Sequence, residues 1–130
     1  AKTSAPSPAA GARKKANAQA LALSLPVRFA FDSAEILPAA RDQLDALAKG
    51  IMLLPADRTV TVEGHTDAAG GNAYNLALSR VRAEAVRDYL VQQHGIDTAR
   101  LRTAGYGEEQ PIEGSDPQAA LNRRVQFRGS

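Results

Sequence analysis

The chain has 130 residues, enough for one domain with a core of its own but too few for two. It has no cysteine, which excludes a disulfide framework and a thiolate metal site. Four of its sixteen basic residues lie within residues 1–19, which contain no acidic residue, so the remainder has twelve basic against fourteen acidic residues and a net charge of −2. Because a clustered basic surface and an aromatic stacking platform are not expected, we predict no nucleic-acid partner.

The N-terminal segment, residues 1–19, is rich in Ala, Ser and Pro and shows no sustained apolar period. This composition is typical of a flexible linker, and we assign residues 20–130 to the folded domain. Neither a secretory segment nor a membrane span is expected, since the unbroken apolar runs are only a few residues long.

The first expected strand covers Leu23–Phe31, where apolar residues occupy every second position from Leu25 onward. Pro26 lacks a backbone donor, which places this strand at a sheet edge or at a bulge. A helix is expected to begin near Pro38, a favourable first-turn residue, and to end before Pro55. Its apolar side comprises Leu44, Leu47, Ala48, Ile51 and Leu54.

A second strand is expected at Arg58–Gly64, followed by a long helix from Ala73 to His94 that contains neither Gly nor Pro. Asn72 is the expected N-cap and Gly95 the left-handed C-cap. Within this helix a set of residues recurs at the spacing that indicates a single buried face. It comprises Ser79, Arg82, Ala83, Val86, Tyr89 and Leu90.

The remaining elements are a strand at Leu101–Gly107, a helical turn near Gln118–Leu121, and a last strand with Val125 and Phe127 facing inward. Strands that alternate with helices predict an α/β fold with a partly parallel sheet. We expect a two-layer sandwich in the order β-α-β-α-β-(α)-β.

Arg82 is the first candidate for a functional residue, because its place on the apolar stripe points it inward. A buried guanidinium keeps its proton and must find an acceptor. The nearest candidate is Asp67, which follows the second strand directly. Two interpretations stay open: a site for a zwitterionic ligand, or an Asx-turn with a plain Asp67–Arg82 salt bridge that closes the loop.

Four blocks of residues strongly resemble the OmpA-like C-terminal domain family, in the family's order and at compatible spacings over Leu21 to Arg128. The first is Phe31-Asp32-Ser33 with Leu37. The second is Gly64-His65-Thr66-Asp67 with Gly70, Asn75, Leu78-Ser79, Arg82-Ala83, Val86 and Tyr89-Leu90. The third is Gly105-Tyr106-Gly107-Glu108 with Pro111, and the fourth is Asn122-Arg123-Arg124-Val125. The stretch between Pro111 and Asn122 departs from the family, being shorter and less Asn-rich, which leaves the fine shape of the site open.

The resemblance implies noncovalent binding of peptidoglycan in the periplasm, through the diaminopimelate residue of the stem peptide. Asp67 and Arg82 would hold the ammonium and the carboxylate at the free end of diaminopimelate. The family's further contacts fall on Phe31, Asp32, Thr66, Asn75 and Leu78. Asp32 could equally be a turn residue, and Asn75 could bond only to the loop backbone. The resemblance also implies a mixed sheet with both long helices on one face, and a ligand groove at the sheet edge near Asp67.

The resulting hypothesis is a noncovalent wall anchor that needs no cofactor, lies in the periplasm beside the outer membrane or cell wall, and reaches a membrane only through a region absent from this chain. A homodimer stays an open alternative. So does the periplasmic part of a flagellar stator or secretion machine, which would anchor to the wall in the same way. From a different class, a protein-binding module that grips a partner's terminus also stays open.

An enzyme is not expected. His65, Asp67 and His94 lack a metal-ligand spacing, and a nucleophilic Ser79 would need a nearby histidine base. Glu63 could pair with Asp67 as in a glycan hydrolase, but strand alternation predicts that Glu63 faces solvent. We expect His65 to bond to the loop backbone and His94 to be exposed at the helix end. Alternation also predicts that Arg123, Arg124 and Arg128 are split across the faces of a solvated or paired strand.

Overall fold

The computed structural model describes residues 26–129, so the expected linker and residues 23–25 of the first expected strand lie outside the described part. The helices are α2 (Pro38–Leu53) and α3 (Asn72–His94). The strands are β1 (Val27–Arg28), β2 (Val60–His65), β3 (Leu101–Gly105) and β4 (Arg124–Gly129). Two short 3-10 turns, Thr98–Arg100 and Ala120–Asn122, precede β3 and β4.

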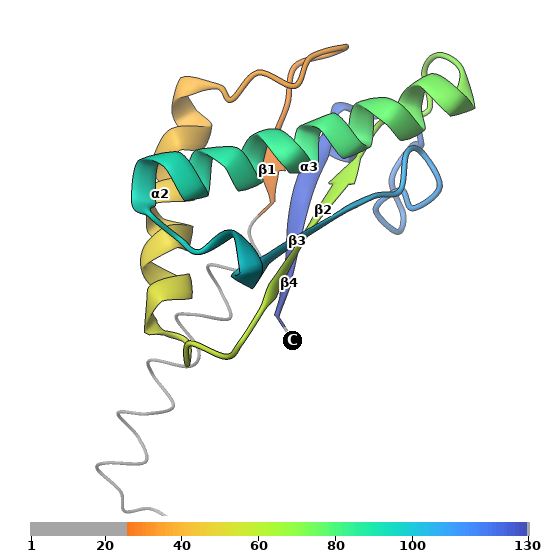
Figure 1. Cartoon of the computed structure of the whole chain (residues 1–130). Coiled ribbons are helices and arrows are strands. Elements are labelled where there is room, and N and C mark those ends of the chain that lie inside the picture. Colours follow the sequence, from red (N-terminus) through yellow and green to blue (C-terminus); the bar gives the residue numbers. More distant parts are fainter. Residues whose placement is uncertain (1–25, 130) are drawn as a thin grey trace, which may run out of the picture.

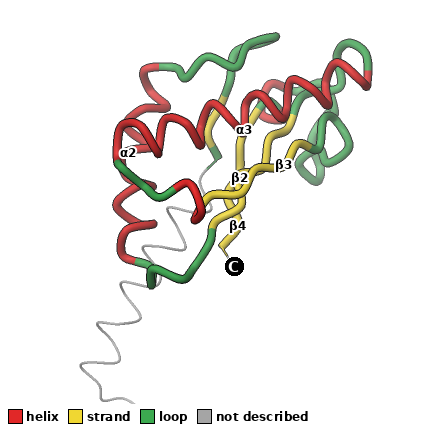
Figure 2. The backbone as a smooth tube through the Cα atoms, in the orientation of Figure 1, coloured by secondary structure: helices red, strands yellow, loops and turns green. Residues whose placement is uncertain are grey.

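The four strands form one mixed sheet in the order β1-β4-β2-β3. β2 pairs with β3 in parallel, and β4 runs antiparallel to both β1 and β2. β1, β2 and β3 therefore point the same way, and their carboxyl ends meet at one end of the sheet. Both helices cover the same face (Figures 1 and 2), which confirms the expected two-layer α/β fold. None of the described helices combines the length and apolar character of a membrane span.

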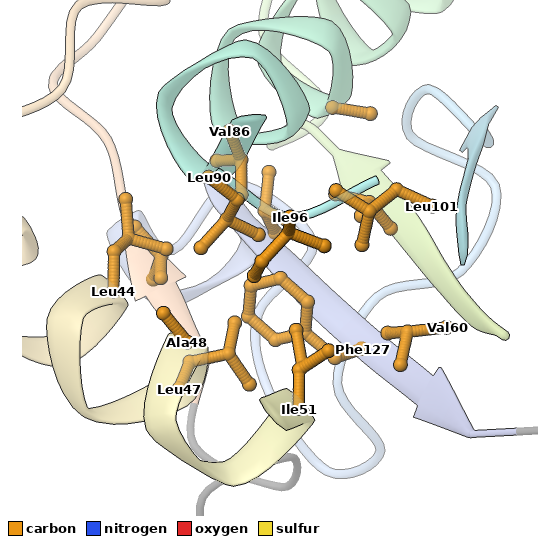
Figure 3. Packing of buried hydrophobic residues seen from close by; sticks show 14 of the residues in the cluster. Leu44, Leu47, Ala48, Ile51, Val60, Val86, Leu90, Ile96, Leu101 and Phe127 are labelled. Atoms are coloured by element: carbon orange, nitrogen blue, oxygen red, sulfur yellow. The ribbon is translucent and has the colours of Figure 1, made fainter. Parts of the chain in front are cut away.

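The hydrophobic core fills the space between the helices and the sheet, where α2, α3 and β4 converge (Figure 3). The predicted apolar side of α2 is confirmed, apart from Leu54, which is half-buried beyond the helix end. The predicted stripe of α3 is also buried, with Tyr89 half-buried at its margin. Val125 and Phe127 face this core as expected. The fully buried members include Leu44, Ala48, Ile51, Val60, Val62, Val86 and Leu90.

The helix ends follow the predicted chemistry with one exception. Pro38 opens α2, and Gly95 closes α3 in a left-handed conformation with φ of 67°. The prediction of Asn72 as the N-cap is wrong, because Asn72 is already helical and Gly71 occupies the cap without a side-chain bond. The loop before α3 is instead held by Asn75, whose side-chain amide donates to the carbonyl oxygen of Ala69 at 2.9 Å.

The first strand is much shorter than predicted. Pro26 precedes β1, which lies at a sheet edge as expected, and Val27 and Phe29 face the core. The alternation then stops, because the chain turns at Phe31 and Asp32, with Asp32 at a φ of 54°. Phe31 consequently has 63% of its surface exposed.

On the helix-free face of the sheet two further predictions are wrong, the exposure of Glu63 and the separation of Arg124 from Arg128. Glu63 points to this face but is only 4% exposed, because Arg128 forms an ion pair with its carboxylate at 3.1 Å and the Tyr106 hydroxyl donates to it. Arg124 and Arg128 are four residues apart on β4, so they share this face, and Arg123 alone departs because it precedes the strand.

Candidate ligand-binding site

A cavity of about 390 Å³ lies at the carboxyl ends of β1 and β2, beside the first turns of α3. The groove was expected at the sheet edge near Asp67, but β2 is an inner strand, so the cavity beside Asp67 lies at one end of the sheet. The cavity gathers all seven predicted site residues: Phe31, Asp32, Thr66, Asp67, Asn75, Leu78 and Arg82. Its other lining residues are Ala69, Gly70, Tyr74 and Arg123. That any of them binds a ligand stays a prediction.

The cavity depends on a close approach between β2 and α3. A Cβ atom added to Gly64 would lie 1.9 Å from the carbonyl oxygen of Ser79, so only glycine allows the helix to sit this near the strand. The Thr66 amide donates to the carbonyl oxygen of Gly107 at 2.9 Å. This hydrogen bond continues the pairing of β2 with β3 beyond the ends of both strands. The residues that follow β2 are thereby held against the start of α3.

Arg82 is fully buried and still reaches the cavity. Its guanidinium donates to the carbonyl oxygens of Ser33 at 2.8 Å, His65 at 3.0 Å and Ala30 at 3.0 Å, and lies 5.2 Å from the centre of the Phe29 ring. Burial, followed by the repulsion of Arg123, lowers the pKa of Arg82 to about 10. The side chain therefore stays protonated at neutral pH.

The acceptors of Arg82 differ from the one expected. Within residues 26–129 there is no Asp67–Arg82 salt bridge, so the simple loop-closing pair is wrong. A guanidinium has five N–H donors. Three of them hold neutral carbonyl groups, which leaves the positive charge without a carboxylate in direct contact.

Asp67 is 5% exposed and is held from both sides. One carboxylate oxygen accepts from the Ala69 amide at 3.1 Å, which confirms the Asx-turn. The other lies 3.2 Å from Nη1 of Arg123, and Nε of Arg123 donates to the carbonyl oxygen of Phe29 at 3.0 Å. The sequence analysis missed this role of Arg123, since 56 residues separate it from Asp67.

The remaining lining residues surround this charged centre. Asn75 donates to the carbonyl oxygen of Ala69 and to a carboxylate oxygen of Glu108 at 2.9 Å each, so it does bond to the loop backbone, but not only to it. The Thr66 hydroxyl is buried and has no hydrogen-bond partner among the described residues. Thr66 is therefore a polar group that an occupant of the cavity could satisfy.

Two exposed aromatic rings, Phe31 and Tyr74, border the cavity together with Asp32. The Tyr74 hydroxyl donates to the Asp32 carboxylate, and this hydrogen bond raises the pKa of Tyr74. The sequence analysis missed Tyr74, although its place one turn before Leu78 on the helix could have indicated it. The pair links the turn after β1 to the first turn of α3.

The two histidines lie outside this cavity and behave differently from the predictions. His65 does not bond to the loop backbone: neither ring nitrogen has a partner within the described residues, and the ring stacks on Tyr106 with centroids 5.4 Å apart. Burial, and then the charge of Arg124, lowers the pKa of His65 to about 4. His94 is half-buried, not exposed, with Nε2 2.7 Å from the Asp45 carboxylate.

The assembled cavity offers two carboxylates, Asp32 and Asp67, and two guanidinium groups, Arg82 and Arg123. Opposite charges around a space of a few hundred Å³ suit a small zwitterion, whose ammonium and carboxylate each find a partner. The described residues contain no group of three His, Cys, Asp or Glu side chains arranged to hold a metal ion.

Comparisons with known proteins show similarity over most of the chain. A family model described as the OmpA family matches residues 28–124. Outer membrane porin F of Pseudomonas aeruginosa is 39% identical over 111 residues, covering 84% of this chain and 31% of that protein. The peptidoglycan-associated lipoprotein of the same species is 43% identical over 102 residues, covering 77% of this chain and 59% of that protein. The chain thus spans less than two thirds of either relative.

A solved structure shows the same fold. The peptidoglycan-associated lipoprotein from Burkholderia pseudomallei superposes with a TM-score of 0.72 at 34% sequence identity, covering 81% of this chain and 89% of that chain. The similarity extends over both helices and the mixed sheet, so the expected architecture and family resemblance are confirmed.

Proposed function

The chain belongs to the OmpA family, and on that premise we propose that it binds peptidoglycan noncovalently through the diaminopimelate residue of the stem peptide. The observation that carries this proposal is the separation of charges in the cavity. Arg82 is held by neutral carbonyl groups, and the carboxylate of Asp67 is held apart from it. A ligand with both an ammonium and a carboxylate complements this arrangement.

In the proposed complex the carboxylate of diaminopimelate takes the free N–H groups of Arg82, and its ammonium approaches Asp67. A hydrogen bond to a charged group contributes on the order of 1.5 to 3 kcal/mol, and a planar guanidinium can grip a carboxylate with two parallel bonds. Because Arg82 is already oriented by three carbonyl groups, little further ordering of its side chain is needed on binding.

Arg123 would act as a positioning residue. It fixes the carboxylate of Asp67 from the side opposite the Asx-turn, while its own Nε is anchored to Phe29. Asp32, Phe31, Thr66 and Leu78 line the same space and would contact the rest of the ligand.

The resulting activity is that of an anchor in the periplasm, beside the cell wall or outer membrane, and not of an enzyme. Of the relatives, one is named a porin of the outer membrane and another a peptidoglycan-associated lipoprotein, and neither name denotes catalysis. A single site of this kind is weak on its own. A repetitive wall and a tether at the other end of the chain would strengthen it through effective concentration.

The test is co-sedimentation of the chain with purified sacculi of the diaminopimelate type. We expect the parent to pellet, free diaminopimelate to release it, and Asp67→Ala to abolish pelleting. Asp57→Ala is the matched control, because Asp57 is exposed in the loop before β2 and lies outside the cavity. Pelleting by Asp67→Ala at the parent level would show that the cavity is not the site.

If the parent itself failed to pellet, the protein-binding alternative would take precedence, with a partner's charged terminus in place of diaminopimelate. A search for released muropeptides after prolonged incubation with the same sacculi tests the absence of catalysis. Their appearance would contradict a purely anchoring role.

A further inference from the structure

Three exposed arginines share the helix-free face of the sheet, on three different strands: Arg28, Arg102 and Arg128. Arg102 and Arg128 are both registered with Thr61 of β2, so they flank it in one cross-strand row. Arg28 is registered with Arg124 in a second row. Both helices lie on the opposite side of the sheet (Figure 2). We name these three side chains the arginine face.

The arginine face is positive although the domain as a whole is not. Among the strand residues that the register places on this side, the acidic one is Glu63, and it is buried under Arg128. Burial, and then the nearby charge of Arg28, lowers the pKa of Arg124, so like charges do meet here. From residue 20 onward the chain is nevertheless acidic by two charges, with twelve basic against fourteen acidic residues, so this concentration of arginine is local.

The spacing of the three arginines indicates the kind of partner. Arg102 and Arg128 are two strands apart, about 10 Å between backbones, and the row of Arg28 lies four residues away along β4, about 13 Å. Guanidinium groups that far apart cannot converge on one compact anion. They suit a broad surface that presents many separate phosphates.

The position of the arginine face points to the same partner. The row of Arg102 and Arg128 at Thr61 lies six residues before Asp67, roughly 20 Å from the cavity along the strand, whereas Arg28 shares the row of His65 through Arg124, two residues before Asp67. The chain enters the sheet at Pro26, at the end of β1 away from the cavity. The upstream sequence, residues 1–25, contributes Lys2, Arg13, Lys14 and Lys15 and no acidic residue, so the positive charge continues along the chain.

We propose that the arginine face binds an anionic phospholipid surface. Basic residues near such a surface are attracted through its negative potential, and the attraction decays within a Debye length. The domain would then contact a membrane through the helix-free face of its sheet, while the cavity lies at the end of β2 beside the first turns of α3. This second contact is independent of the proposed wall binding.

The experiment is co-flotation of the full chain with vesicles, one set containing phosphatidylglycerol and phosphatidylcholine and the other phosphatidylcholine alone. We expect the parent to float only with the anionic set, and less so at physiological salt than at low salt. In Arg28→Gln/Arg102→Gln the partition should fall roughly tenfold. The matched control Arg41→Gln/Lys49→Gln removes the same charge from exposed positions of α2 and should float like the parent.

Three results would overturn the proposal. They are a parent that binds neither set, equal flotation with neutral vesicles, and unchanged flotation of Arg28→Gln/Arg102→Gln, which would assign the affinity to residues 1–25. The same variants are also pelleted with sacculi, where we expect parent-like binding. Loss of sacculus binding in Arg28→Gln/Arg102→Gln would mean instead that the arginine face binds carboxylates of the wall. Binding of a protein that depends on the arginine face and needs no lipid would mean instead that the partner is an acidic protein.

Discussion

The two faces of β2 are both buried, but by different means. On the helix side, Val60 and Val62 have no exposed surface and pack in the apolar core, and Gly64 ends the row where α3 makes its closest approach. On the opposite side, Glu63 and His65 are nearly as inaccessible, although no helix covers them. Their cover consists of long polar and aromatic side chains.

The difference shows two ways of burying a strand that leads to a binding cavity. The helix side relies on close packing, which tolerates neither added nor missing volume. The helix-free side relies on ion pairs and ring stacking, which tolerate changes of shape but respond to pH and salt. Both sides deliver the segment from His65 to Asp67 to the cavity, so each can be disturbed separately.

The largest effect is expected from Gly64→Ala on the helix side. Its Cβ atom would meet the backbone of Ser79 at 1.9 Å, so α3 must shift away from β2. We expect a loss of about 3 kcal/mol or more in the free energy of unfolding, measured by urea denaturation. Gly71→Ala is the control, because a Cβ there meets nothing within 4 Å, and an equal cost in both variants would contradict the packing argument.

The next effect is expected from Arg82, whose Nη1 is bonded to the carbonyl oxygen of His65 at the end of β2. Arg82→Ala leaves three carbonyl groups without their donor and should cost about 3 kcal/mol as well as sacculus binding. Arg82→Lys keeps the charge but not the planar fork, so we expect it to be more stable than Arg82→Ala and still at least tenfold weaker in binding. Full binding by Arg82→Lys would show that charge alone suffices.

The helix-free side of β2 should make the stability of the domain depend on pH. The pKa of His65 is about 4 in the folded protein, against about 6.5 in an unfolded chain. Between these values the unfolded chain binds a proton that the folded protein does not, so the stability falls as pH decreases from 6.5 towards 4, by up to about 3 kcal/mol. Above pH 6.5 this contribution is constant.

His65→Phe tests this dependence, since it keeps a ring against Tyr106 and removes the titrating nitrogens. We expect the difference in unfolding free energy between variant and parent to grow as the pH is lowered from 7 to 4.5. At pH 7 the variant should be no less stable, because His65 has no hydrogen-bond partner to lose among the described residues. Parallel pH profiles of the two proteins would rule out His65 as the source.

The sequence predicted the helix side of β2 far better than the other. Apolar alternation and helical periodicity depend on short-range spacing, so the strand, both helices and the inward direction of Arg82 could be predicted. Glu63 was assigned to solvent by the same alternation, because the rule identifies the side of the strand and cannot identify what covers it. The cover of Glu63 comes from Arg128, 65 residues away.

The site shows the same limit. The residues that the motifs indicated do surround one cavity, but the partners of its charges were misassigned. Asp67 and Arg82 are close in sequence, and that proximity suggested a pair. The structure pairs Asp67 with Arg123 and gives Arg82 three backbone carbonyl groups, which have no signature in the sequence. These contacts join residues far apart in the sequence, so they can be identified only once the order of the strands in the sheet is known.

The smallest effect is expected from Glu63→Gln, which keeps the side-chain shape and removes its charge. Since 68% of the Arg128 side chain is exposed, water and salt screen its ion pair with Glu63, and we expect a loss of about 1 kcal/mol or less in the free energy of unfolding. The loss should shrink further at high salt, whereas Glu84→Gln on the exposed surface of α3 should show almost none. A loss comparable to that of Gly64→Ala would mean that the helix-free side is as rigidly packed as the core. A salt-independent loss would mean that the hydrogen bond from Tyr106, and not the ion pair with Arg128, is what holds Glu63 in place.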